Sequence, residues 1–137
     1  MQNLIKRFSI IHRKSGIQLD KRLKALDIPY GQFMYILCVC EQEGLSQEQL
    51  ATVLQIDKGS VARTLQQLER QGYILRIVSA EDKRQNLIYP TEKSKTAYPQ
   101  ITNTIDRWQE ELTSNLSAIE IDILANLLDK VLANLEQ

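Results

Sequence analysis

Histidine and cysteine are scarce in this chain of 137 residues, which has one His and two Cys. A structural zinc site needs four ligands of these kinds, so the chain cannot assemble one. Cys38 and Cys40 stand two positions apart in an apolar run, where on a helix they would point to different faces, so a mutual disulfide is not expected. We interpret both as buried thiols. A thiol-redox switch is the alternative, although no basic sequence neighbour would lower either pKa.

Long apolar runs and catalytic motifs are also missing. No stretch approaches the roughly 18 consecutive apolar residues of a membrane span, and charges interrupt the apolar part of the N-terminus, unlike a secretory signal. We therefore expect a cytoplasmic protein that does not enter the membrane. The chain has no Gly-rich phosphate loop and no paired carboxylates in an apolar setting, so we expect neither an enzyme nor a bound cofactor or metal.

A surplus of positive charge is absent as well, because 17 Lys and Arg balance 17 Asp and Glu. Taken alone, this balance argues against a nucleic-acid-binding protein. The charges are segregated, however. Residues 1–24 hold seven Lys and Arg against one acid, residues 57–84 hold six against four, and residues 101–137 hold two against seven. A neutral sum therefore does not exclude a basic face.

The first third of the chain has the periodicity of helices. Apolar residues recur at steps of three and four from Leu4 to Leu26, which predicts a long amphipathic helix ending at residues 27–29. Pro29 suits the first turn of a second helix, predicted from Tyr30 to about Glu43 and apolar on most sides. Such a helix is typical of a protein core.

Two short helices and a tight turn are predicted next. Ser46 and Gln49 form a capping box that starts a third helix carrying Leu50, Val53 and Leu54. After a turn at residues 55–56, Asp57 would cap a fourth helix over residues 58 to about 71, with Val61, Leu65 and Leu68 facing the core. The opposite face would carry polar, non-acidic side chains able to bind phosphates or base edges, namely Lys58, Ser60, Arg63, Thr64 and Gln67.

A β-hairpin and two long helices complete the predicted fold. Two β-rich runs, residues 73–78 and 86–89, flank the charged segment 79–85, which predicts a hairpin with a projecting loop. Thr91 and Ser94 would open a long helix, and a last helix would start at about Ser117. The first and the last two helices carry more apolar surface than a small domain can cover, so we expect a homodimer.

In this order of elements, the chain resembles the MarR family of bacterial transcriptional regulators over essentially its whole length. The most specific match is Asp82-Lys83-Arg84 followed by an apolar strand and Thr91, similar to the family's D-x-R…L-T pattern. Supporting matches are Gln32-Phe33, Leu45-Ser46 and the segment LERQGY at residues 68–73. Tyr89-Pro90 and Ser94 depart from the family at the junction between strand and helix.

The resemblance implies a single domain over residues 1–137, mainly α with a small β wing. Residues 29–90 would form a winged helix-turn-helix, and residues 1–28 and 91–137 would be dimerisation helices. It also implies a homodimer on a palindromic operator in double-stranded DNA, with the fourth helix in the major groove and a wing arginine in the minor groove. Many members release DNA when a small anionic or phenolic ligand binds. We therefore expect a transcriptional regulator, in the first place a repressor.

Specific roles follow for a few side chains. Arg84 at the hairpin tip suits a narrow minor groove, where the negative potential is enhanced. Asp82 would hold that arginine or the loop by a charge-assisted bond, with Lys83 supporting. His12 and Arg13 could meet an anionic effector, or form a solvated basic face. The alternative function is a protein-interaction adaptor or antirepressor without operator binding, which could tolerate acidic or apolar residues on the fourth helix.

Overall fold

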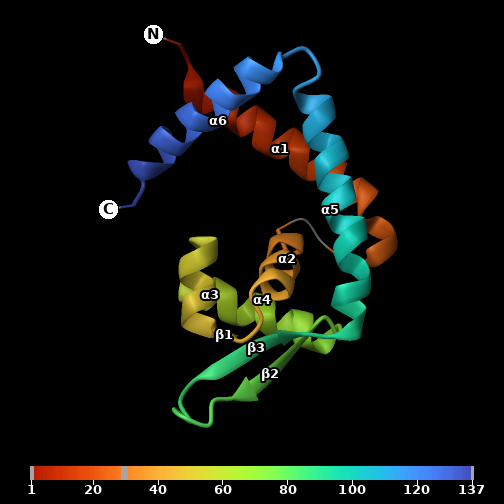
Figure 1. The fold of residues 1–137 in the computed structure, drawn as a ribbon, viewed down its shortest axis with the longest axis vertical. Helices are drawn as coiled ribbons and strands as arrows, with labels where there is room; N and C mark the ends of the chain where they lie inside the picture. Colours follow the sequence, from red (N-terminus) through yellow and green to blue (C-terminus); the bar gives the residue numbers. More distant parts are fainter. Residues whose placement is uncertain (1, 29–30, 137) are drawn as a thin grey trace. The chain divides into compact units, whose positions relative to one another are not determined.

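Six α-helices and a three-stranded antiparallel sheet make up residues 2–28 and 31–136, the part of the chain that the computed structural model describes (Figure 1). The predicted class, mainly α with a small β wing, is confirmed. The chain divides into two compact units, Met1–Ile105 and Asp106–Gln137. The elements are α1 (Leu4–Arg22), the 3-10 helix η1 (Lys24–Leu26), α2 (Phe33–Glu41), β1 (Leu45–Ser46), α3 (Gln47–Leu54), α4 (Lys58–Arg70), β2 (Ile74–Val78), β3 (Asn86–Pro90), α5 (Glu92–Leu112) and α6 (Ala118–Ala133).

Helix α1 is shorter than predicted. It ends at Arg22, and η1 then leads to Asp27, whose φ of 54° lies in the left-handed region. The periodicity of apolar residues runs on because a 3-10 turn also places residues three apart on one side. Leu19 and Leu23 are buried, whereas Leu4 and most of the other apolar residues of α1 nearer its start are exposed. Only the C-terminal end of the helix therefore packs into the core of the first unit.

Helix α2 begins later and ends earlier than predicted. It starts at Phe33 after Gly31, whose φ of +93° does not fit a right-handed helix. Pro29 and Tyr30, where the start was predicted, lie outside the described residues. The helix stops at Glu41, and the N–H of Gly44 donates to the carbonyl of Ile88 at 2.9 Å. As expected, α2 is mostly buried.

The helix-turn-helix formed by α3 and α4 follows the prediction closely. Ser46 Oγ accepts from the N–H of Gln49 at 3.1 Å, and Gln49 Oε1 accepts from the N–H of Ser46 at 2.9 Å, which completes the capping box. Asp57 caps α4 by accepting from the N–H of Ser60 at 2.9 Å. Of the apolar residues of α3, Leu50 and Ala51 are buried, whereas Val53 is exposed. The predicted core face of α4 is confirmed, with full burial of Val61, Leu65 and Leu68.

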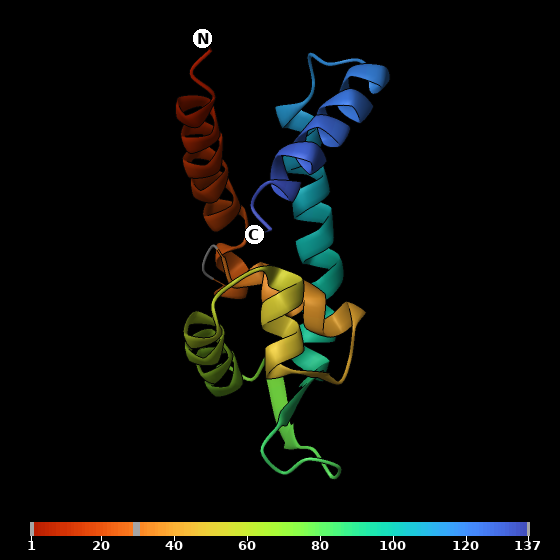
Figure 2. The same cartoon turned by 90° about the vertical axis from the view of Figure 1, so that its left-hand side faces the viewer.

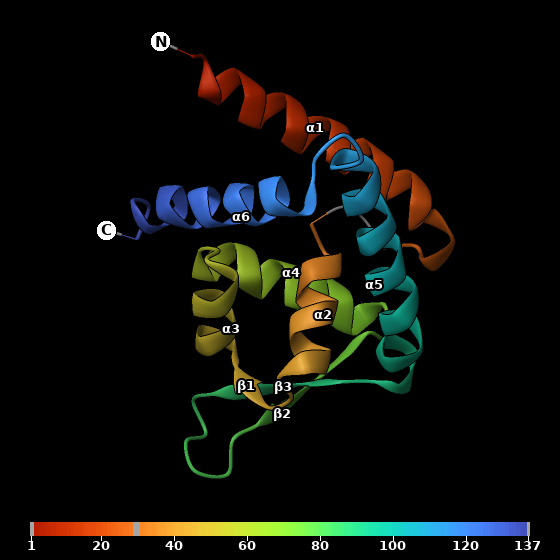
Figure 3. The ribbon, with the colours of Figure 1, turned by 45° about the horizontal axis from the view of Figure 1, so that its top comes forward.

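The sheet has one strand more than the sequence indicated. Strands β2 and β3 form the predicted hairpin, and the two-residue β1 pairs with β3 on its other side, Leu45 opposite Ile88 and Ser46 opposite Leu87. Two residues are too few to show the alternation by which a strand is recognised. The loop between β2 and β3 extends away from helices α2, α3 and α4 (Figures 2 and 3).

The last two helices start as predicted. Thr91 and Ser94 cap the start of α5 reciprocally, since the N–H of Thr91 donates to Ser94 Oγ at 2.9 Å and the N–H of Ser94 to Thr91 Oγ1 at 3.3 Å. In the second unit, Ser117 and Glu120 form a capping box for α6. No residue of α6 is buried. None of the helices in the described part of the chain is long and apolar enough to cross a membrane.

Candidate nucleic-acid interface

The first half of α4 presents a short chain of polar contacts. Ser60 Oγ donates to Asp57 Oδ1 at 2.7 Å and accepts from Arg63 Nη2 at 3.2 Å. These bonds from Ser60 hold the pKa of the Asp57 carboxyl below its usual range. Arg63 itself is exposed. The N-terminal cap of the helix thus also orients the guanidinium that the sequence assigned to DNA.

Gln67 lies differently from the rest of the predicted set. Its Oε1 accepts from Nε2 of Gln32 at 2.8 Å, and Gln32, the residue before α2, is only 8% exposed. Gln32 Oε1 is buried and has no hydrogen-bond partner among the described residues. The structure therefore turns the amide of Gln67 toward α2, although the residue as a whole stays exposed. Thr64 is half-buried on the same helix. The sequence offered no signal for this contact, because the two glutamines are 35 residues apart.

The wing loop is closed by its own hydrogen bonds. The N–H of Ser79 donates to the carbonyl of Gln85 at 2.9 Å, and the N–H of Gln85 donates to the carbonyl of Asp82 at 3.0 Å. The buried Ser79 accepts on its Oγ from the N–H groups of Glu81 and Asp82, at 3.3 and 3.2 Å. A loop of seven residues, 79–85, therefore has a defined shape without packing into the core.

Asp82 and Arg84 are bonded to each other, as the sequence predicted. Asp82 Oδ1 accepts from the backbone N–H of Arg84 at 3.0 Å and from its Nε at 3.2 Å. The bond from the guanidinium side chain, followed by the backbone bond, lowers the pKa of the Asp82 carboxyl. The Arg84 side chain remains 90% exposed, and Lys83 beside it is exposed too. A third, longer bond joins Nη2 of Arg84 to Asp82 Oδ2 at 3.5 Å, so the guanidinium is oriented by Asp82 and still open to solvent.

An ion pair joins α4 to strand β2 of the hairpin. Arg76 on β2 donates to Glu69 Oε1 on α4 from Nη2 at 2.9 Å and from Nε at 3.2 Å. This hydrogen bond lowers the pKa of Glu69. The contact holds the middle of β2 against α4. The polar groups of α4 and of the hairpin are therefore held on elements that are bonded to each other.

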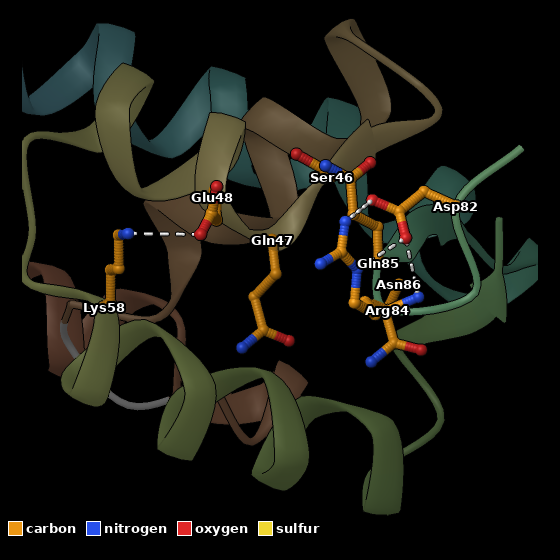
Figure 4. A pocket seen from close by; sticks show the side chains of 8 residues that line it. All are labelled: Ser46, Gln47, Glu48, Lys58, Asp82, Arg84, Gln85 and Asn86. Atoms are coloured by element: carbon orange, nitrogen blue, oxygen red, sulfur yellow. Dashed lines mark hydrogen bonds and ion pairs between the residues drawn. The ribbon is translucent and has the colours of Figure 1, made fainter.

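A cleft of about 530 Å³ lies between the start of α3, the start of α4 and the wing (Figure 4). It brings together three residues of the predicted set, Lys58, Asp82 and Arg84. The other predicted DNA-binding residues do not line it, namely Ser60, Arg63, Thr64, Gln67 and Lys83. Figure 4 shows that each cation in the cleft is bonded to an acid, Lys58 to Glu48 and Arg84 to Asp82. The lining residues are Ser46, Gln47, Glu48, Lys58, Asp82, Arg84, Gln85 and Asn86.

Three amides of this cleft were missed by sequence reasoning. Gln47 is the first residue of α3, and Gln85 and Asn86 lie where the wing loop meets β3. In the sequence they stand out only as polar residues beside a predicted helix cap or loop. Such residues are common on any protein surface. Gln47 Oε1 is buried and lacks a hydrogen-bond partner within the described residues. Amides and cations in one cleft can donate to phosphate oxygens.

The remaining predicted residues lie elsewhere. His12 and Arg13 are exposed on α1 and do not line the cleft. Cys38 is buried as expected, but Cys40 is only half-buried. Burial raises the pKa of both thiols, and for Cys40 this outweighs a hydrogen bond to Ser94 and the charge of Lys95, which lower it. Within residues 2–28 and 31–136, no group of three His, Cys, Asp or Glu could hold a metal.

A helix-turn-helix followed by a hairpin with a projecting loop defines a winged helix-turn-helix protein. A model of the MarR family matches residues 28–85. The solved transcriptional regulator SlyA is 31% identical, with 98% of this chain and 94% of that chain covered and a TM-score of 0.93. The chain therefore belongs to the MarR family of transcriptional regulators.

Two further relatives are similar over nearly the whole chain. A MarR family regulator from Listeria monocytogenes, solved in complex with a 26mer DNA, is 29% identical, covers 98% of this chain and 89% of its own, and has a TM-score of 0.91. The HTH-type transcriptional regulator YybA of Bacillus subtilis is 28% identical over 137 residues, which are 100% of this chain and 91% of that protein. The members of this family are transcriptional regulators rather than enzymes.

Proposed function

We propose that this protein binds double-stranded DNA as a homodimer at a palindromic operator and represses transcription there. The observation that carries the proposal is the pair of exposed arginines, Arg63 on α4 and Arg84 on the wing, each oriented by a hydrogen bond from its own element. The DNA complex of the Listeria relative supports it. A cytoplasmic location follows from this function.

In this proposal, α4 lies in the major groove and the wing in the minor groove. Arg63 would reach a guanine edge or a phosphate, with Ser60 and Thr64 near the neighbouring bases. Arg84, with Lys83 beside it, would enter the minor groove, where narrow A·T-rich segments attract a guanidinium. The cleft that contains Lys58 would take the sugar-phosphate backbone between them. Residues 29–90 would thus read DNA.

Dimerisation is assigned to residues 1–28 and 91–137, because their helices leave apolar side chains uncovered. Exposed apolar patches of this size mark interfaces. Light scattering after size exclusion should give twice the 15.8 kDa mass of one chain, and a monomeric mass would contradict the proposal. Most large apolar residues of α6, and Leu135 beyond its end, are 38–72% exposed. They are Ile119, Ile123, Leu124, Leu127, Leu128, Val131, Leu132 and Leu135.

The test of DNA binding starts with selection of bound sequences from a random DNA pool. A DNA reader should enrich a palindrome and lose affinity steeply with salt, by about 0.9 in log K per log salt for each phosphate neutralised. Arg63→Ala should cost about 1–3 kcal/mol of affinity for the selected site. Arg70→Ala, which removes an exposed arginine from the other end of α4, is the matched control. An Arg63→Ala protein that binds normally would refute the assignment.

Release by a small anionic or phenolic ligand is the second part of the proposal. His12 and Arg13 supply exposed basic side chains on α1. Aromatic acids should raise the melting temperature of the wild type if they bind the folded protein, and His12→Ala with Arg13→Ala should abolish the shift. The adaptor alternative is less favoured, because the outer face of α4 carries Lys58, Arg63 and polar groups rather than acidic or apolar ones.

A further inference from the structure

Glu48 is an acid in a cleft proposed to receive phosphate. It is the second residue of α3, its side chain is 67% exposed, and its Oε1 lies 3.1 Å from Nζ of Lys58, which is 77% exposed. The other acid of the cleft, Asp82, has a separate role because it orients Arg84. Glu48 instead forms an ion pair with Lys58, the first residue of α4.

The side chain of Glu48 is not needed to start α3. The capping box uses the side chains of Ser46 and Gln49. Thr52 Oγ1 donates to the backbone carbonyl of Glu48 at 3.2 Å and so does not involve its carboxylate. An exposed Lys–Glu pair also contributes little to stability. A carboxylate in the first turn of α3 interacts favourably with the helix dipole, but this modest effect does not require the ion pair with Lys58.

We propose that Glu48 limits the affinity of this protein for DNA by competing with phosphate for Lys58. The inference rests on the proposed DNA-binding function and deepens it. When a phosphate enters the cleft, Lys58 leaves the carboxylate of Glu48 and binds the phosphate instead. The released carboxylate then faces the phosphate, at a distance over which two like charges repel even in water.

Ion release gives this competition a measurable signature. When Lys58 neutralises a DNA phosphate, the cations condensed around that phosphate are released into solution. The carboxylate of Glu48, freed at the same moment, takes up a cation in its place. The two effects cancel, so in the wild type Lys58 adds almost nothing to the salt dependence of binding. Without the carboxylate of Glu48, the affinity for DNA should show the full salt dependence of one additional phosphate contact.

The experiment compares the wild type, Glu48→Gln, Lys58→Met and the double variant. Each is titrated across a range of salt with a duplex of the operator selected from the random pool. Glu48→Gln should bind about fivefold more tightly per subunit at low salt. Its log K should fall more steeply with log salt, by about 0.9 per subunit. Lys58→Met should leave the slope of the wild type unchanged and remove the added slope from Glu48→Gln.

The matched control is Glu43→Gln. Glu43 also pairs with a lysine, Lys95 at 3.9 Å, and both are half exposed, but neither lines the cleft. This variant should bind as the wild type does, and thermal unfolding should show that all five proteins fold. Unchanged or weaker binding by Glu48→Gln, or an added slope that survives Lys58→Met, would overturn the inference alone. If none of the five binds DNA, the proposed function fails and the inference fails with it.

Discussion

Replacing Asp82 by alanine should weaken DNA binding, although it removes a negative charge from the wing. Asp82 Oδ1 holds Arg84 by two bonds, at 3.0 Å to the backbone N–H and 3.2 Å to Nε. The Arg84 side chain is 90% exposed and depends on this carboxylate for its orientation. In Asp82→Ala the guanidinium would be free to sample its rotamers and would have to be ordered when DNA binds.

Two opposing effects set the size of the change. Ordering a free arginine costs up to about 2 kcal/mol. Loss of the carboxylate removes its repulsion of phosphate, which is worth about 1 kcal/mol at 4 Å in water and is screened by salt. The ordering cost does not depend on salt. At physiological ionic strength we therefore expect a net loss of about 1 kcal/mol, or about fivefold in Kd, and a larger loss at higher salt.

Fluorescence anisotropy with the selected operator at two salt concentrations would measure both effects. Glu81→Ala is the matched control, because Glu81 is an exposed acid in the same loop that makes its hydrogen bond through its backbone N–H. It should bind slightly more tightly than the wild type, and only at low salt. If Asp82→Ala behaves like Glu81→Ala at both concentrations, the carboxylate acts as a charge alone and the positioning role is wrong.

Two further predictions concern stability. Gln67→Ala should lower the free energy of unfolding by about 1–3 kcal/mol, because the buried amide of Gln32 would lose its partner. Urea unfolding measures this loss. Gln66→Ala, at a neighbour as exposed as Gln67, is the control, and an equal loss in it would contradict the prediction. Acidification should also destabilise the protein. Asp57, Glu69 and Asp82 have lowered pKa values, so their contribution is complete above the unfolded pKa of about 4 and is lost as the pH falls through the folded values. The melting temperature should therefore be steady from about pH 5 to 7 and drop below about pH 4, and a variant with all three neutralised should drop less.

Local signals explain most of the fold that could be predicted. Ser46 and Asp57 cap their helices through contacts three residues away, and Val61 and Leu65 are buried at helical spacing. Each of these features depends on residues within about two turns, so the sequence alone contains them. The errors lie at boundaries. The end of α1 differs because a 3-10 turn continues its apolar spacing, and the start of α2 because Gly31 adopts a positive φ.

The site was predictable only where its contacts are local. The Asp82–Arg84 bond spans two residues, and the sequence indicated it correctly. The contacts from Gln32 to Gln67 and from Lys58 to Glu48 span 35 and 10 residues, and they change what those side chains are free to do. Such pairings depend on how helices are packed rather than on any pattern along the chain. A list of polar residues on one helical face is therefore not yet a list of residues free to touch DNA.

Ser46 belongs to two elements at once, and this has a mechanical consequence. It pairs with Leu87 in the sheet, and its side chain caps α3. No flexible residue therefore separates the first helix of the helix-turn-helix from the hairpin, and Glu69 with Arg76 ties the hairpin to α4 as well. Within one subunit, these bonds oppose a change in the separation of α4 and the hairpin. Operators whose half-sites are spaced differently must then be accommodated by motion between the two subunits of the proposed dimer, because bending inside either one would break these bonds.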